Sequence, residues 1–261
     1  MEVIGFIGAF FIGIVIGLTG GGGSILTVPL LVYVLGYNPV VSAAYSLFIV
    51  GTSSAFGAFL NYRKKLVAIK TGIIFAIPSF IGVFVTRKYI VPNIPEIIFN
   101  IDTITLTKNT FLMLFFAVIM LLAALSMLKK TKLNLKEVTK KHYLIKIILQ
   151  NITIGIVIGL VGAGGGFLII PSLLLIAKIP MKKAIGTSMF IIAINSLIGF
   201  LGDVQSLDIN WKFLIPFTII SMAGIFTGNY ISKYINEHQL KKGFAYFVLV
   251  MALVIAFKEL M

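Results

Sequence analysis

Two glycine clusters are the part of this sequence whose residue types and spacing best suit binding chemistry. They read TGGGGS at Thr19–Ser24 and VGAGGG at Val161–Gly166. Successive glycine amides form a concave set of N–H donors, and the helix that begins after each cluster adds unpaired amides and a positive dipole end. Such an arrangement suits an oxyanion. The candidate binding residues in the clusters are Thr19, Gly20, Gly21, Gly22, Gly23, Ser24, Gly162, Gly164, Gly165 and Gly166.

The two clusters belong to an internal repeat with a spacing of 142 positions. Placed over one another without a gap, Ile12–Phe59 and Ile154–Leu201 are identical at 18 of 48 positions. The match includes the glycine clusters and Pro29 with Pro171, which low complexity alone would not align. An internal duplication of this kind is typical of transporters.

Hydroxyl and amide side chains on the apolar segment after each cluster would complete the shell around an anion. Ser46 and Ser53 are seven residues apart and share one face of a helix, as do their counterparts in the second half. A lone Ser or Thr in a membrane segment also commonly bonds one helix to another. The two roles are evenly balanced for Ser46 and Ser188, whereas the interhelical role is favoured for Thr52 and Ser54. The candidates on these segments are Ser46, Ser53, Thr187, Ser188 and Asn195.

Other kinds of chemistry are not visible in the sequence. No Lys-Ser or Lys-Thr follows either glycine cluster, so neither is a phosphate-binding P-loop. No Asp, Glu, His, Lys or Arg lies in the middle of an expected span, which argues against a proton relay. Because the sequence shows no nucleophile–base pair and no cluster of metal ligands, we expect no catalytic residue, no metal and no cofactor.

Composition places these residues in a membrane protein. Hydrophobic residues make up 59% of the chain and charged residues 11%, which is more apolar surface than a water-soluble domain can bury. Continuous apolar runs such as Thr110–Leu128 favour helices over a β-barrel. The net charge of +14 resides in short loops, as the positive-inside rule expects. We therefore expect a multi-pass protein of the cytoplasmic membrane with the lipid bilayer as its partner, and no nucleic acid.

Each half begins with an apolar stretch that glycine interrupts. As helices, Gly5–Leu18 would be about 21 Å long and Ile25–Leu35 about 16 Å, shorter than a hydrocarbon core of ~30 Å. In the second half Leu144–Val161 is about 27 Å long and could cross, whereas Phe167–Ala177 could not. Three ordinary spans follow in each half, near Ser42–Leu60, Thr71–Tyr89 and Thr110–Leu128, then Ala184–Leu201, Phe213–Ile231 and Gly243–Phe257.

Loop charges indicate how the interrupted stretches run. If each returns to its own side of the membrane, every basic loop lies in the cytoplasm. We therefore expect an all-α polytopic membrane protein of two inverted repeats, each a glycine-broken re-entrant helical hairpin plus three transmembrane helices. The repeats cover residues 1–128 and 144–261, a basic cytoplasmic linker covers 129–143, and both termini face outward.

The motifs resemble those of the sulfite exporter TauE/SafE family of membrane permeases. The segments GLTGGGGSILTVPLL and GLVGAGGGFLIIPSLL match the family's glycine-rich segment followed by proline, and AIGTSMF at Ala184–Phe190 matches its Ala-x-Gly-Thr-Ser element. The resemblance implies export or uptake of small sulfur or carbon oxyanions such as sulfite and sulfonates. The first-half counterpart, AAYSLF at Ala43–Phe48, lacks Gly-Thr, so the two half-sites are expected to be unequal.

Two functional interpretations stay open at this point. The first is a transport protein that moves a small oxyanion, such as sulfite or an organosulfonate, outward across the membrane. The alternative is a channel-like or non-transport membrane partner protein whose glycine segments serve helix packing. An intramembrane enzyme is disfavoured because no catalytic constellation exists. The oligomeric state is open, with a homodimer as one option.

Overall fold

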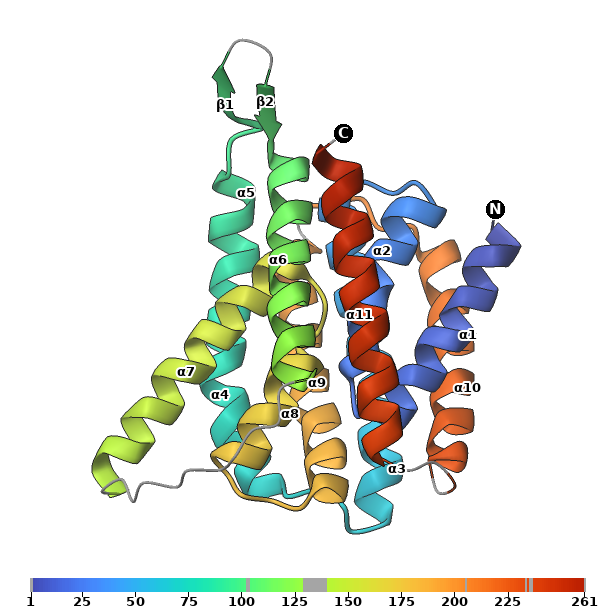
Figure 1. Cartoon of the computed structure of the whole chain (residues 1–261), viewed down its shortest axis with the longest axis vertical. Coiled ribbons are helices and arrows are strands. Elements are labelled where there is room, and N and C mark those ends of the chain that lie inside the picture. The colour runs from blue at the N-terminus through green and yellow to red at the C-terminus, as the bar shows by residue number, and fades with distance from the viewer. Residues whose placement is uncertain are drawn as a thin grey trace.

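The computed structural model describes residues 2–101, 104–128, 140–204, 206–232, 234 and 237–260. The described chain is a bundle of helices with one small two-stranded hairpin (Figure 1). This confirms the all-α expectation for the membrane part. Five of the described helices are long and apolar enough to cross a membrane: Pro39–Arg63, Ile69–Asn93, Lys108–Ser126, Met181–Asp203 and Trp211–Ile231. The sixth expected span, Gly243–Phe257, lies within α11.

The first half contains α1, an irregular helical segment and three long helices. The irregular segment passes from a 3₁₀ turn through a short α-helix into a π-helical turn. A second π-helical turn, η3, joins α4 to α5 without interrupting the rod. The elements are α1 (Glu2–Thr19), η1 (Gly22–Leu26), α2 (Thr27–Pro29), η2 (Leu30–Val34), α3 (Pro39–Arg63), α4 (Ile69–Val85), η3 (Thr86–Ile90), α5 (Val91–Asn93) and α6 (Lys108–Leu128).

The second half repeats this order, but the single helix α8 takes the place of the irregular segment η1–α2–η2. Its helices are α7 (Lys140–Val161), α8 (Gly166–Leu175), α9 (Met181–Asp203), α10 (Trp211–Ile231) and α11 (Glu237–Leu260). The antiparallel strands β1 (Ile97–Ile101) and β2 (Ile104–Thr107) join α5 to α6 and project beyond one end of the bundle. The loop charges predict only a near-neutral loop between these helices, so the two strands were not predicted from the sequence.

Local sequence signals account for the starts of two long helices, α3 and α10. Asn38 caps α3 by accepting a hydrogen bond from the amide of Val40 at 2.9 Å, and Pro39 occupies the first helical position. Asn210 caps α10 in the same manner by accepting from the amide of Phe213 at 3.3 Å. These caps orient the two helices that follow the polar, non-basic loops.

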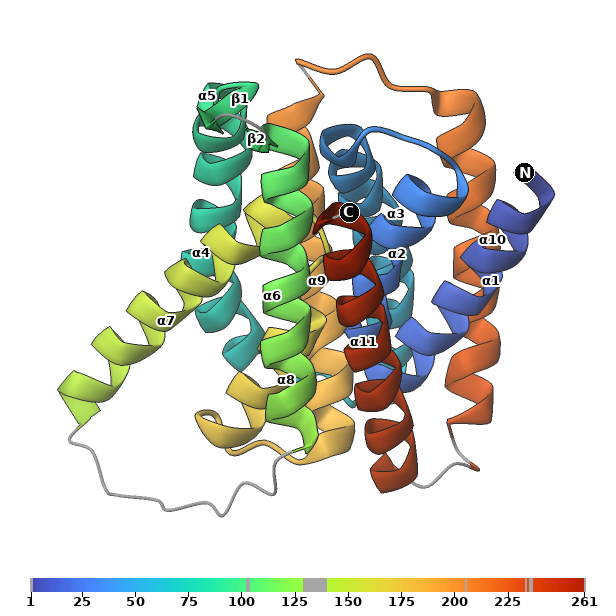
Figure 2. The same ribbon diagram turned by 45° about the horizontal axis from the view of Figure 1, so that its top comes forward.

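After each glycine break the chain reverses direction. In the first half the side chains of Leu35 and Leu30 lie against Gly5 and Gly8, so the returning segment runs antiparallel to α1. In the second half the Gln150 amide on α7 donates to the Ser172 hydroxyl on α8 at 2.9 Å. Both structures are therefore helical hairpins, and α1 and α7 each end at their glycine cluster (Figures 1 and 2).

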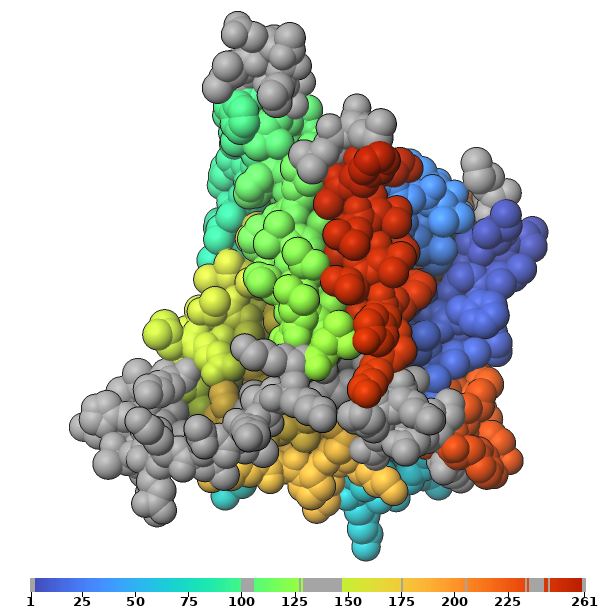
Figure 3. Space-filling view, viewed as in Figure 1, coloured from blue at the N-terminus to red at the C-terminus, as the bar shows by residue number. Residues whose placement is uncertain are grey.

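The helices pack in pairs that match under the 142-residue repeat. Helix α1 packs along α10, and its counterpart α7 packs along α4; α3 packs against α9, and α6 against α11. Figure 3 shows α6 and α11 side by side on one face of the molecule. Large apolar side chains on both helices point outward there, including Leu122 and Leu253, each 57% exposed. An apolar exterior of this kind suits lipid rather than water.

Glycine permits two of these pairings. A Cβ on Gly13 of α1 would lie 2.0 Å from the carbonyl oxygen of Ser221 on α10, and a Cβ on Gly155 of α7 would lie 2.1 Å from that of Ser79 on α4. Both contacts are to backbone, which cannot rotate away. The small residue is therefore a packing requirement at both sites.

We expect Gly13→Ala and Gly155→Ala each to lower the stability of the purified protein by about 1–3 kcal/mol, because overpacking forces the helices apart. The matched control is Gly243→Ala on α11, where an added Cβ meets nothing within 4 Å. Thermal unfolding in detergent measures all three. Midpoints for Gly13→Ala and Gly155→Ala equal to that of the control would contradict the close-packing account.

Candidate functional site

The two glycine clusters meet inside the bundle. A Cβ on Gly166 would lie 2.4 Å from the carbonyl carbon and oxygen of Gly21, and both residues are buried. The backbones of the two hairpin tips are thus in direct contact, with no side chain between them. Tips that are far apart in the sequence are brought together only by the tertiary fold.

Both tips use backbone angles that only glycine adopts readily. The angle φ is +73° at Gly20, +103° at Gly21 and between +65° and +73° at Gly162, Gly164 and Gly165. This confirms that glycine reverses the chain at the breaks. Gly165 adopts the left-handed conformation directly before α8, whereas the first tip leads into the 3₁₀ turn η1. The two tips are therefore similar in outline and unequal in detail.

Part of the expected donor nest is already occupied by protein acceptors. The amides of Gly20 and Gly21 donate to the carbonyl oxygen of Ile16, and the amide of Gly23 donates to the Thr19 hydroxyl. Within the described residues, the amides of Gly22 and Gly164 donate to no protein acceptor. These two glycines are counterparts in the repeat. Each tip therefore keeps an unpaired N–H at the same place.

The hydroxyls within the first tip stabilise the tip itself. Thr19 donates to the carbonyl oxygen of Val15 at 2.7 Å and accepts from Gly23 at 3.2 Å. Ser24 donates to the carbonyl oxygen of Gly21 at 2.7 Å and also to that of Ala163 in the second tip. Thr19 and Ser24 thus lie at the expected site, and their hydroxyl groups hold the two tips in shape.

Four of the candidates on α3 and α9 bond neighbouring elements. Ser188 donates to the carbonyl oxygen of Gly20 at 2.5 Å, and Thr187 accepts from the amide of Ala68 at 2.9 Å. Two pairs related by the repeat then cross between helices, Ser53–Ser221 at 3.2 Å and Ser79–Asn195 at 3.0 Å. Ser53 and Asn195 thus have an interhelical role, whereas Thr187 and Ser188 bond the backbone before α4 and in the first tip.

Several buried polar groups on α3 and α9 have no hydrogen-bond partner. They are the hydroxyls of Ser46, Thr52, Ser54 and Ser196 and the amide nitrogen of Asn195. Ser196 lies beside the second tip, because its oxygen is 3.3 Å from the position of a Cβ on Gly164. Gly164 thus has an unpaired amide of its own and the unpaired Ser196 hydroxyl among its neighbours. Ser54, the counterpart of Ser196, was assigned an interhelical role from sequence, yet it bonds to no neighbouring helix.

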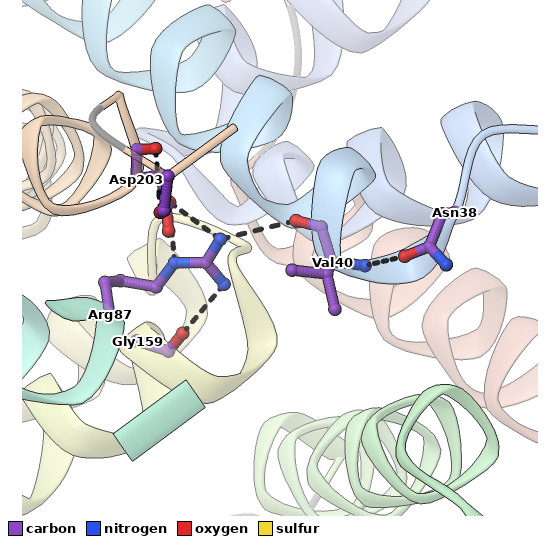
Figure 4. A network of polar contacts seen from close by, with 6 residues as sticks. Asn38, Val40, Arg87, Gly159 and Asp203 are labelled. Carbon is purple, nitrogen blue, oxygen red and sulfur yellow. Dashed lines mark hydrogen bonds and ion pairs between the residues drawn. The ribbon is translucent and has the colours of Figure 1, made fainter. Parts of the chain in front are cut away.

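A buried ion pair lies at the other end of α9, and sequence reasoning missed it. The Arg87 guanidinium on η3 bonds the Asp203 carboxylate at 2.7 Å, and both residues are buried (Figure 4). Arg87 also donates to the carbonyl oxygens of Gly159 at 3.4 Å and Val40 at 3.3 Å. One side chain therefore connects η3 with α9, with the end of α7 just before the second tip, and with the start of α3.

The sequence contains a signal for this pair, a charged residue within an apolar helix, which mean hydropathy does not reveal. Arg87 lies within the 25-residue apolar helix Ile69–Asn93, where a charge must find a partner. Under the repeat, Arg87 and Asp203 correspond to Asn229 and Asn61, which are buried and uncharged. The ion pair thus joins the two halves, and its counterpart under the repeat is uncharged. In the described part of the chain no group of three potential metal ligands comes together.

The long apolar helices and the joined, glycine-broken hairpins define a multi-pass membrane protein. The model of the sulfite exporter TauE/SafE family matches residues 5–255, and the chain therefore belongs to that family. No solved structure matches the chain significantly.

Two of the curated relatives described here match most of the chain, and the third matches less than half of it. A "Probable membrane transporter protein" of Xylella fastidiosa is 25% identical over 255 residues, 95% of this chain and 92% of the relative. The "Probable membrane transporter protein YunE" of Bacillus subtilis is 28% identical over an alignment 275 positions long, which covers 90% of this chain and 91% of the relative. The "Probable membrane transporter protein MJ0441" of Methanocaldococcus jannaschii is 37% identical over 116 residues, 42% of this chain and 43% of the relative.

We expect Arg87→Asn and Asp203→Asn each to destabilise the protein by about 3–5 kcal/mol, because removing one partner leaves a buried charge unpaired. The double variant Arg87→Asn/Asp203→Asn reproduces the side chains of Asn229 and Asn61, the counterparts of the pair under the repeat. It should recover much of the loss, because no charge remains buried. Thermal unfolding in detergent reports the three midpoints. A double variant whose loss equals the sum of the single losses would contradict the pairing argument.

Proposed function

We propose that this transporter moves a small oxyanion, such as sulfite or an organosulfonate, through a site at the joined glycine tips. The observation that carries the proposal is the pair of unpaired amides at Gly22 and Gly164, equivalent positions of two tips whose backbones touch. A buried donor without a partner costs about 1–3 kcal/mol. Such donors are tolerated where a ligand pairs with them, and that ligand must carry hydrogen-bond acceptors.

Unpaired donors on α3 and α9 support an anion as the ligand. The hydroxyls of Ser54 and Ser196 are free to donate, and the Asn195 amide nitrogen can only donate. An oxyanion has several oxygens that accept such bonds, and bonds to a charged acceptor are stronger than neutral ones. Helix α8 adds the positive end of its dipole at the second tip. We assign Ser53, Thr187 and Ser188, which bond neighbouring elements, to holding this shell in place.

We further propose that the two halves are inverted repeats whose hairpins enter the membrane from opposite sides. The antiparallel return of each hairpin and the matched helix pairs support this arrangement. Irregular backbone at membrane depth persists only where protein buries it or a wet cavity adjoins it, and the joined tips meet that condition. In this arrangement the basic loops face the cytoplasm and both termini face outward.

Cysteine labelling tests the topology, because the chain has no cysteine of its own. We expect a membrane-impermeant maleimide to label Val3→Cys and Lys258→Cys from outside intact cells. It should label Thr131→Cys, in the linker, only after the membrane is opened. Protection of Lys258→Cys together with labelling of Thr131→Cys in intact cells would overturn the inverted arrangement.

The direction of transport follows from the charge of the cargo. An inside-negative membrane potential favours the exit of an anion by about 2.3 kcal/mol per charge per 100 mV. Amides and hydroxyls do not titrate near neutral pH, so these donors carry no coupling proton. The membrane potential alone can then drive the flux. We therefore propose net outward movement without a coupling ion.

Proteoliposomes loaded with sulfite, with potassium and valinomycin setting the voltage, test both the site and the direction. We expect efflux to increase as the interior becomes more negative. Ser54→Ala and Ser196→Ala should raise KM roughly tenfold, the loss of one hydrogen bond to a charged group. Neither should lower the unfolding midpoint, because neither hydroxyl has a protein partner. The control is Thr227→Ala, whose exposed hydroxyl bonds its own helix at Ala223.

The competing interpretation, in which the glycines only pack helices, makes the opposite prediction. It expects normal efflux from well-folded Ser54→Ala and Ser196→Ala proteins, or no efflux from the wild type. Efflux that ignores voltage and strictly requires a proton or sodium gradient would leave the anion site in place and overturn uncoupled transport.

A further inference from the structure

An apolar groove of about 450 Å³ lies on the outer side of helices α3 and α9. Its walls include Ala58, Phe59 and Tyr62 of α3, Phe190 and Leu197 of α9, and Ile69 at the start of α4. No residue of the glycine tips lines it. Its lining side chains are hydrocarbon apart from the Tyr62 hydroxyl, so the groove cannot hold an oxyanion and is separate from the transport site.

The groove is open to the surroundings of the bundle. Phe59 and Tyr62 are more than half exposed and Ile69 is 42% exposed, whereas Ala58 at the floor is 7% exposed. Its volume falls within the range of about 300–1,000 Å³ that is typical of sites for small ligands. The shape is therefore that of an apolar slot facing the bilayer, with small residues at its base.

The second half of the molecule shows that this groove is not required by the fold. At the equivalent place Phe200 stands where the first half has Ala58, and Trp211 stands where it has Ile69. These two rings pack on Phe48 at centroid distances of 5.0 and 5.5 Å and fill the space. The same arrangement of helices is thus filled by side chains in one half and left hollow in the other.

Basic residues cluster beside the open groove. Arg63 extends over the ring of Phe59, with its Cζ 6.0 Å from the ring centroid. Lys64, Lys65 and Lys70 follow in the same loop region and are exposed. Within the described residues none of these four cations forms an ion pair. The equivalent loop, Gly202–Asn210, has no Lys or Arg and carries Asp203 and Asp208, and of the four cations only Lys70 has a basic counterpart, Lys212.

We propose that the groove binds one acyl chain of an anionic phospholipid, whose phosphate is held by the Arg63–Lys70 loop. The hydrocarbon walls match an acyl chain, and the unpaired cations at the groove's edge match a negatively charged headgroup. Basic residues at this membrane surface attract anionic lipids. A second protein copy would fit the apolar walls equally well but would leave four unpaired cations without a counter-charge.

Native mass spectrometry of the delipidated protein tests this, with phosphatidylglycerol or phosphatidylcholine added back. The wild type should retain one phosphatidylglycerol with roughly tenfold preference over phosphatidylcholine. Ala58→Phe/Ile69→Trp, which copies the filled half, should lose that molecule. Arg63→Gln/Lys64→Gln changes only exposed side chains and should keep a lipid while losing the preference.

The matched control is Phe200→Ala/Trp211→Ile, which opens the equivalent space in a region where Lys212 is the single counterpart of the four cations. It should gain no phosphatidylglycerol. The proposal is overturned by equal retention of the two lipids in the wild type, or by unchanged phosphatidylglycerol binding in a well-folded Ala58→Phe/Ile69→Trp protein. A wild-type dimer that this variant separates, with no loss of lipid, would overturn it in favour of a second copy of the chain.

Discussion

Direct contact between glycine backbones is the constraint on which this structure depends. It occurs where α1 meets α10 at Gly13, where α7 meets α4 at Gly155, and where the two tips meet at Gly21 and Gly166. Burial of apolar side chains cannot by itself drive helices together in lipid, because lipid tails are equally apolar. Close backbone approach provides the dispersion contacts instead. A Cβ at any of these positions would separate elements that the rest of the bundle holds in register.

The same constraint explains why the candidate site is built from backbone. Two tips that touch through glycine leave little room for side chains, so the donors at the contact are amides, with hydroxyls supplied from α3 and α9. Polar side chains close to the tips divide into two groups. Ser24 and Ser188 satisfy tip carbonyls, whereas Ser54 and Ser196 remain unpaired. The first group fixes the shape of the site, and we assign the second group to the ligand.

The two halves share a backbone plan and differ in the chemistry at corresponding places. Tyr45 and Thr187 are counterparts, and each accepts a hydrogen bond from a backbone amide, at 2.8 and 2.9 Å. The aromatic ring of Tyr45 then packs against Tyr37 and Phe213, which the small threonine cannot do. The Arg87–Asp203 pair and the filled space at Trp211 also have no equivalent under the repeat. Duplication thus preserved the main-chain contacts while side chains at the two ends of the bundle diverged.

Sequence alone determined that the chain is a membrane protein, where its long helices lie and where glycine breaks them, because hydropathy and backbone propensity are properties of local segments. It also placed Gly22 and Gly164 at equivalent positions through the repeat. Only the tertiary structure decided which polar groups are satisfied, since a hydroxyl such as Ser53 or Ser196 is paired or free according to the helix that faces it. The same reason hid the Arg87–Asp203 pair, whose members are 116 residues apart: a buried charge is stable only beside its partner, and folding alone brings the two together.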